Sequence, residues 1–187
     1  EVSKYKSYNL IVKRIPALLK KETQISNEQY TFEGSISTGN IAEVPWICIF
    51  DIDITNSAED GFYIVFLFQA NMKGVYLSLN QGFSKYKSEY GFKKGMYKIK
   101  LAALKYQNKI SDRYDYNIDR ITLHAKSSLG KGYEAGNICS KYYSCGNFPE
   151  DKELIADLKN LVAIYDELKK QIILTGVESE ILPPEEE

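Results

Sequence analysis

Four carboxylates gather around one expected loop of this 187-residue chain. Asp51 and Asp53 end one apolar run, and Glu59 and Asp60 precede the next. Carboxylate oxygens are preferred ligands of hard divalent cations, so the cluster could hold a metal ion. A nuclease of the PD…(D/E)xK pattern would also need an acid and a Lys on adjacent strands, and residues 62–69 contain neither. We interpret the cluster as a solvated acidic loop, with a nuclease site as the alternative.

Other catalytic groups are scarce. The single His, His124, falls within an expected strand, and no nucleophile elbow accompanies it. The chain contains neither GxxxxGK[ST] nor GxGxxG, so no nucleotide cradle is indicated. Cys139 and Cys145 lack the paired spacing of a zinc site, and Cys48 lies inside an apolar run. We therefore expect a binding module with no catalytic residue, no metal and no cofactor.

Aromatic residues offer a different chemistry. The only Trp, Trp46, follows Pro45 at the start of an apolar strand. It is either a plug in the core or a flat surface for stacking. Aromatic residues make up 13% of the chain, and 15 of them are Tyr. Tyr is common at wet binding surfaces, but it is also an ordinary strand residue.

The net charge of −1 hides an uneven distribution. The tail at 178–187 carries five Glu and no base, so the rest of the chain carries +4. Between Lys85 and Lys109 eight Lys face one acid, Glu89, which gives this segment +7. Aromatic residues alternate with these lysines, and such a segment is a candidate phosphate-binding surface. The alternative is a solvated helix face followed by a loop.

No apolar run is long enough to span a membrane, and residues 1–10 lack the apolar core of a signal peptide. Three Cys cannot all pair, so a reducing cytoplasm is the simplest compartment. The chain begins without Met, which suggests a piece of a longer protein or a processed product. We expect one domain over 1–176, followed at 177–187 by an acidic linker to a further domain.

Hydrophobic periodicity predicts an α+β fold, with a central and mostly antiparallel sheet flanked by N-terminal and C-terminal helices. The segment 44–52 should be covered on both faces, and 62–82 should form a hairpin. The expected strands are 30–37, 44–52, 62–69, 75–82 and 119–125. The expected helices are 4–21 with a break at Pro16, a helix within 95–109, and 149–174, while 131–148 is expected to be irregular.

Three stretches resemble a known family: GNIAEVPWICIFD (39–51), DGFYIVFLF (60–68) and GVYLSLNQG (74–82). In this order and spacing they resemble the N-terminal DNA-binding domain of the McrB type, from modification-dependent restriction systems. Weaker support comes from GYEAGNICSKYY (132–143) and from the Leu and Tyr spacing at 154–165. Together these stretches cover most of the chain.

The resemblance implies a specific target. A McrB-type domain binds double-stranded DNA that carries a modified cytosine, and it flips that base into a pocket. The downstream partner is a GTP-driven motor that recruits a nuclease, or a nuclease fused directly to the domain. The isolated domain is then expected to be a non-catalytic monomer in the cytoplasm.

The resemblance also implies the pocket residues. The family uses an aromatic residue in the Gly-Asn turn, the Trp after Pro, and a Tyr and a Leu on the following strand. Carried over, these positions are Thr38, Trp46, Tyr63 and Leu67. The chain departs from the family pattern at Thr38, so an aromatic ring at this position can neither hold the flipped base nor select its modification.

Polar and basic groups around the pocket complete the predicted interface. The Gly-Asn turn could read base edges or phosphate, or it could serve only the turn geometry. We expect the lysines before the predicted helix to lie in a loop that contacts phosphate. The candidate DNA-binding residues are Gly39, Asn40, Lys85, Lys87, Lys93 and Lys94.

Strand geometry is compatible with such a pocket. Side chains alternate with a period of two, so Tyr63, Val65 and Leu67 share one face. Flipping costs a few kcal/mol, and stacking returns roughly 1–3 kcal/mol per base. Phosphate contacts must then supply the remaining affinity.

Two alternatives stay open. Because Thr38 replaces an aromatic residue, the domain could read another modified base or unmodified DNA. A Tyr-rich surface could instead bind a partner protein. A steep loss of affinity with salt would distinguish a phosphate-dependent interface from a protein contact.

Overall fold

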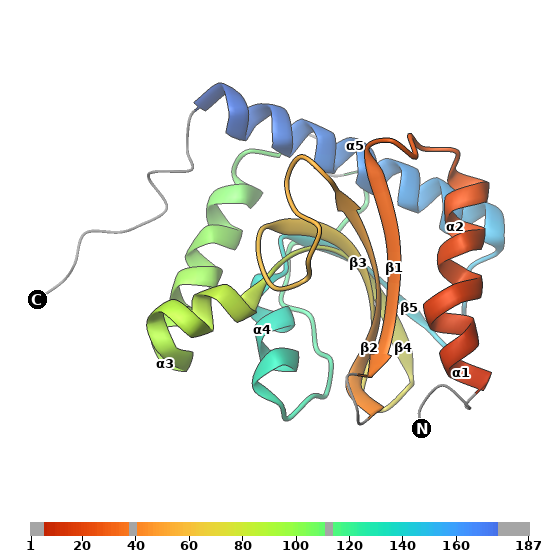
Figure 1. The fold of residues 1–187 in the computed structure, drawn as a ribbon, viewed down its shortest axis with the longest axis horizontal. Coiled ribbons are helices and arrows are strands. Elements are labelled where there is room, and N and C mark those ends of the chain that lie inside the picture. Colours follow the sequence, from red (N-terminus) through yellow and green to blue (C-terminus); the bar gives the residue numbers. More distant parts are fainter. Residues whose placement is uncertain (1–5, 38–40, 111–113, 176–187) are drawn as a thin grey trace, which may run out of the picture.

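The computed structural model describes residues 6–37, 41–110 and 114–175 and shows an α+β fold (Figure 1). Five strands form one antiparallel sheet in the order β1-β2-β3-β4-β5. The predicted fold class is therefore confirmed. The strands are β1 (Tyr30–Ser37), β2 (Ile41–Asp51), β3 (Phe62–Phe68), β4 (Gly74–Gln81) and β5 (Cys139–Ser144).

Strand β2 is buried on both faces, as its continuous apolar sequence predicted. Ile47 and Ile49 pack into the core on one side of the sheet. Cys48 and Phe50 pack into a second core on the other side. The predicted hairpin at 62–82 is also confirmed, because β3 and β4 pair along their whole length. The sheet thus has two buried faces that need two separate covers.

The N-terminal helical region changes its hydrogen-bond pattern before its proline, but it continues as a helix where the sequence predicted two helices with a kink. It consists of α1 (Lys6–Tyr8), the π-helix η2 (Asn9–Arg14) and α2 (Ile15–Thr23). Pro16 has no N–H to donate to the preceding turn. The Ile15 N–H bonds to the Leu10 carbonyl, five residues back, so the chain widens into a π-turn before the proline.

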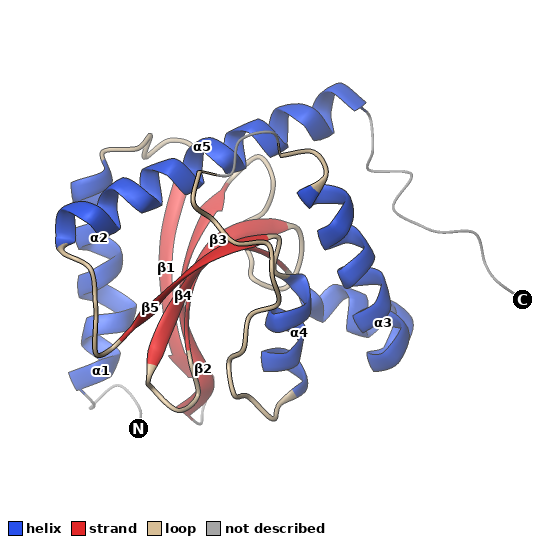
Figure 2. Cartoon of the chain, turned by 180° about the vertical axis from the view of Figure 1, so that it is seen from behind, coloured by secondary structure: helices blue, strands red, loops and turns tan. Residues whose placement is uncertain are grey.

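The predicted C-terminal helix is α5 (Asp151–Thr175). Leu158, Leu161 and Leu168 are fully buried on one face of it. The Tyr165 hydroxyl, also buried, donates to the Phe62 carbonyl at 2.6 Å and ties α5 to β3. In Figure 2, α1 and α2 lie to the left of the sheet, α3 (Phe83–Gln107) and α4 (Ser128–Gly136) lie to its right, and α5 runs across the top.

Helix α3 (Phe83–Gln107) is longer than the predicted helix within 95–109. It bends at Gly91, where φ is +71°. The bend brings Gly95 so close to the first turns that a Cβ there would lie 2.8 Å from the Tyr86 carbonyl oxygen. Gly91 and Gly95 obscured the helical pattern in the sequence, because glycine is a poor helix former.

Two further sequence predictions were wrong. Residues 119–125 form no strand; they alternate between buried and exposed side chains but join no ladder. Residues 131–148, expected to be irregular, contain the end of α4 (Ser128–Gly136) and all of β5. In the first case, the alternation of apolar and polar residues resembled the pattern of a half-buried strand. In the second, the glycines of α4 concealed a short helix.

Within the described ranges, no helix combines the length and apolarity needed to cross a membrane. The acidic segment 177–187, predicted as a linker, lies outside the described residues. The division of the chain into a domain and a linker therefore stays a prediction.

Candidate nucleic-acid interface

The pairing of β2 with β3 brings three of the predicted pocket residues onto one face of the sheet. Trp46 is the direct cross-strand partner of Leu67. Tyr63 and Val65 lie on the same face as Leu67, as their spacing predicted. We call this side of the sheet the Trp46 face, made by Val44, Trp46, Cys48, Phe50, Tyr63, Val65 and Leu67.

These three residues differ in exposure. Trp46 is partly buried, whereas Tyr63 and Leu67 are 0% exposed. The Tyr63 hydroxyl lies 3.0 Å from the Ala58 carbonyl and 3.3 Å from the Gln81 carbonyl, and burial raises its pKa well above the usual value. Trp46 is thus the member of the three that a ligand can contact without rearrangement.

A stretch without helix or strand buries the rest of the Trp46 face. We call residues 118–127 the cover segment. Its Ile121 and Leu123 are almost completely buried against Tyr63 and Leu67 in one core, and Tyr133 of α4 packs beside them. The cover segment replaces the strand that the sequence predicted here.

Side chains hold much of the cover segment's backbone. Gln69 donates to the Thr122 carbonyl at 2.7 Å, and Glu134 accepts from the Leu123 N–H at 2.7 Å. A backbone bond from the Ala70 N–H to the Leu123 carbonyl at 2.8 Å adds to these. Side-chain partners satisfy the buried polar groups that a ladder would otherwise satisfy.

Glu43 on β2 fixes the end of the cover segment. Its two carboxylate oxygens accept from the Lys126 N–H at 2.7 Å and the Ser127 N–H at 2.8 Å. The hydrogen bond from Lys126, followed by those from Ser127, lowers the pKa of Glu43. Ser127 then begins α4, where its hydroxyl accepts from the Gly130 N–H at 3.1 Å.

The sequence did not single out two aromatic residues near Trp46. Tyr76 is the cross-strand partner of Leu67 and of Tyr142, so a single row runs from Trp46 through Leu67 to these tyrosines. The Tyr76 and Tyr142 rings are 4.8 Å apart, and Tyr142 is 44% exposed. The alternation of β4 could have placed Tyr76, but Tyr142 depends on the unpredicted β5.

The predicted lysines lie on α3 and not in a loop. Lys85 forms an ion pair with Asp60 at 2.8 Å, and Lys87 donates to the Ser128 hydroxyl at 2.9 Å. Lys93 and Lys94 are exposed near the Gly91 bend, with the Lys94 ammonium 5.9 Å from the centre of the Tyr90 ring. Thr38, Gly39 and Asn40 lie outside the described residues.

The acidic cluster is only in part the solvated loop that the sequence suggested, because Asp53, Glu59 and Asp60 are exposed whereas Asp51 is not. Asp51 is buried, and its carboxylate accepts from Lys169 at 2.9 Å and from Gln29 at 3.0 Å. Lys169 also pairs with Asp53 at 2.8 Å. Among the described residues, no group of three His, Cys, Asp or Glu is placed to hold a metal ion. Asp51 and Asp53 thus join the end of β2 to α5.

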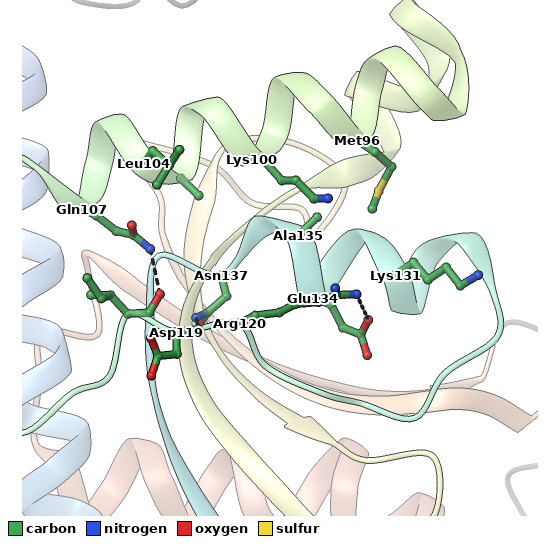
Figure 3. Close-up of a pocket in the computed structure, with 12 residues that line it drawn as sticks. Met96, Lys100, Leu104, Gln107, Asp119, Arg120, Lys131, Glu134, Ala135 and Asn137 are labelled. Atoms are coloured by element: carbon green, nitrogen blue, oxygen red, sulfur yellow. Dashed lines mark hydrogen bonds and ion pairs between the residues drawn. The ribbon is translucent and has the colours of Figure 1, made fainter.

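A cavity of about 270 Å³ lies between α3 and α4 (Figure 3). Met96, Leu104 and Ala135 form apolar walls, while Arg120 pairs with Glu134 at 3.6 Å at its edge. Gln107 donates to the Ile118 carbonyl at 3.2 Å, so the cavity adjoins the start of the cover segment. It does not include Trp46, Tyr63 or Leu67.

Replacing Glu43 with Gln should loosen the cover segment, because a neutral amide offers one acceptor oxygen in place of two charged ones. We expect the Lys126 and Ser127 amide protons to exchange several-fold faster in Glu43→Gln, as measured by hydrogen exchange followed by NMR. Glu153→Gln on α5, which removes an exposed carboxylate elsewhere, should leave both rates unchanged.

The parent protein should show the same effect with pH. Because the pKa of Glu43 is lowered in the folded state, its contribution is complete above the ordinary value of 4.5 and is lost as the pH falls through the lowered pKa. Protection factors of the two amides that are equal in Glu43→Gln and the parent, and independent of pH, would show that Glu43 does not anchor the segment.

Comparison with known proteins assigns the chain to a family. No curated protein matches the chain. The family described as the MrcB-like N-terminal domain matches residues 1–170, which is most of the sequence. The resemblance inferred from the three sequence stretches is therefore confirmed. The chain belongs to the MrcB-like N-terminal domains, the non-catalytic DNA-binding domains of the McrB type.

Proposed function

We propose that the domain recognises a modified cytosine, C5-methylated or C5-hydroxymethylated, in double-stranded DNA by flipping the base against Trp46. One observation carries the proposal. Trp46 is partly exposed, and its cross-strand partner Leu67 and the neighbouring Tyr63 lie beneath the same face. An aromatic wall beside apolar side chains suits a base that carries a methyl group on C5.

The free energies of stacking, methyl burial and base flipping indicate what each part of this interface contributes. Stacking on Trp46 contributes roughly 1–3 kcal/mol. Burial of one methyl group adds about 1 kcal/mol, so discrimination against plain cytosine is modest unless the shape of the pocket excludes it. Flipping costs a few kcal/mol, and contacts with phosphates must offset that cost.

In this proposal the base reaches Tyr63 and Leu67 only when the cover segment shifts. Both side chains are 0% exposed beneath Ile121 and Leu123. The segment has no ladder of its own and depends on Glu43, Gln69 and Glu134 for hydrogen bonds. DNA would therefore have to bind the shifted arrangement more tightly than the closed one.

The proposed setting is a modification-dependent restriction system in the cytoplasm. The domain would be a monomeric targeting unit, joined through the acidic segment at 177–187 to a GTPase motor or a nuclease. Phosphates would be held by Lys85, Lys87, Lys93 and Lys94, and base edges or phosphate by Gly39 and Asn40. Thr38 would occupy the position where the family pattern has an aromatic residue.

The alternative functions would use the same fold. A different modified base, or unmodified DNA, would use the same face with another preference. A protein partner would use exposed tyrosines such as Tyr97, Tyr114 and Tyr142, which are 60%, 52% and 44% exposed. We favour DNA because the family is a DNA-binding one and α3 carries most of the basic segment.

Binding to matched duplexes that differ at one cytosine should distinguish these possible functions. With plain, C5-methyl, C5-hydroxymethyl and N4-methyl duplexes, we expect one of the two C5-modified duplexes to bind best in a fluorescence anisotropy titration. Trp46→Ala should weaken that duplex by about 10-fold to 100-fold, which corresponds to the loss of one stacking contact.

Tyr114→Ala removes an exposed aromatic ring away from the Trp46 face and is the matched control. It should leave the order of the four duplexes and their affinities unchanged. If Trp46→Ala stays folded and all four duplexes still bind as they do to the parent, Trp46 is a core residue and the proposal fails.

Neutralising Lys93 and Lys94 should lower the salt dependence of duplex binding. Each lost phosphate contact reduces the slope of log K against log salt by about 0.9, so Lys93→Gln with Lys94→Gln should reduce it by about 2. The preference between modified and plain duplexes should persist. The measurement is a titration at several salt concentrations.

Lys152→Gln with Lys159→Gln removes two exposed lysines from α5 and serves as the control. Equal slopes for the parent and both double variants would place the phosphate contacts elsewhere. A shallow slope in the parent itself would favour a protein partner.

A further inference from the structure

Lys98 on α3 is buried without an anionic partner. It is 6% exposed, and among the described residues its ammonium group forms no ion pair or hydrogen bond. The ammonium group instead makes a cation–π contact with the Tyr90 ring, whose centre is 4.4 Å away. Lysine is almost never buried unless it is paired, because desolvation of the charge is costly. A buried cation over an aromatic ring therefore indicates a place for an acceptor that comes from outside the chain.

Lys98 lines a cavity of about 540 Å³, within the size range of small-molecule sites. The cavity lies between the β2–β3 loop, both parts of the bent helix α3 and the end of α5. We call it the Lys98 cavity. Its aromatic lining consists of Phe62, Tyr86, Tyr90 and Tyr106. Aromatic walls of this kind offer stacking and edge contacts to a planar ring.

Acidic residues at the Lys98 cavity do not neutralise Lys98. Asp60 is paired with Lys85 at 2.8 Å, and Asp53 is paired with Lys169 at 2.8 Å. The third acid, Glu89, is exposed and forms no ion pair with Lys98 among the described residues. The buried ammonium is thus available to one anionic group, while acids at the rim disfavour a highly charged polyphosphate.

Gln81 adds an unused acceptor to the same cavity. It is 1% exposed, and its amide nitrogen donates to the Ile99 carbonyl at 3.3 Å and the Gly136 carbonyl at 3.2 Å. Because both partners are acceptors, the nitrogen must face them, and the side-chain oxygen has no donor among the described residues. A ligand with an amino group could satisfy it.

We propose that the Lys98 cavity is a second ligand site, distinct from the Trp46 face, that binds a nucleoside monophosphate. The planar base lies against the tyrosine walls, and the single phosphate accepts from Lys98. The volume, the aromatic lining, the unpaired buried cation and the unused amide oxygen together match this class of ligand. The site does not depend on the proposed reading of modified cytosine.

Isothermal titration with adenosine monophosphate tests the site. Adenosine alone reports the contribution of stacking to the affinity, and inorganic phosphate alone reports the contribution of the charge. We expect the monophosphate to bind the parent at least ten-fold more tightly than either fragment. Lys98→Met keeps the length and the apolar stem of the side chain, and it should weaken the monophosphate by at least ten-fold.

Lys94→Met is the matched control, because it removes an exposed lysine that lies over the same Tyr90 ring. It should bind adenosine monophosphate like the parent. Trp46→Ala should also bind it like the parent, which separates this site from the DNA face. If Lys98→Met fails to fold, Lys98→Arg keeps the charge and should retain binding within about five-fold.

Three results would overturn the proposal. The first is equal binding of the monophosphate by the parent and a folded Lys98→Met. The second is loss of binding in a folded Trp46→Ala, which would place the nucleotide on the Trp46 face. The third is inorganic phosphate binding as tightly as the monophosphate, which would leave an anion site without a nucleotide.

Discussion

The register between β2 and β3 is the constraint on which the rest of the domain depends. Pairing of Trp46 with Leu67 assigns every side chain of the two central strands to one of two buried faces. A slip by one residue would move Trp46 beneath α2 and α5 and bring Ile47 to the opposite side. The covers differ accordingly. Regular helices close one face, and an irregular segment with the short helix α4 closes the other.

That difference links the fold to its proposed function. The helix α5 is fixed by buried leucines and by the Asp51–Lys169 pair, so its face is a permanent core. The cover segment buries Ile121 and Leu123 as well, but side chains such as Glu43 and Glu134 hold its backbone. Such hydrogen bonds can be exchanged for contacts with water or DNA at a modest cost, so a tightly bound duplex can supply the energy to exchange several of them.

The sequence was most informative where the hydrophobic pattern was strong. The first four strands, the hairpin at 62–82 and α5 followed from periodicity, and the irregular helical turn before Pro16 agrees with its missing N–H. The wrong predictions have two physical causes. Glycines at 91 and 95 interrupted the pattern of α3, so its lysines were assigned to a loop. Residues 119–125 alternate like a strand, but their hydrogen bonds go to distant side chains that no local pattern reveals. The alternation of side chains along a strand correctly placed Tyr63 and Leu67 on one face. Their complete burial, however, depends on that distant segment.

A modified base that stacks on Trp46 should change the intrinsic fluorescence of this residue, and that change is the most direct measure of the contact. Trp46 is the only Trp of the chain, so its emission reports on one site. Stacking should give saturable quenching by a C5-modified duplex, at the concentrations at which that duplex binds, and weaker quenching by the plain duplex. If the modified duplex binds and the emission of Trp46 does not change, the base does not stack on Trp46.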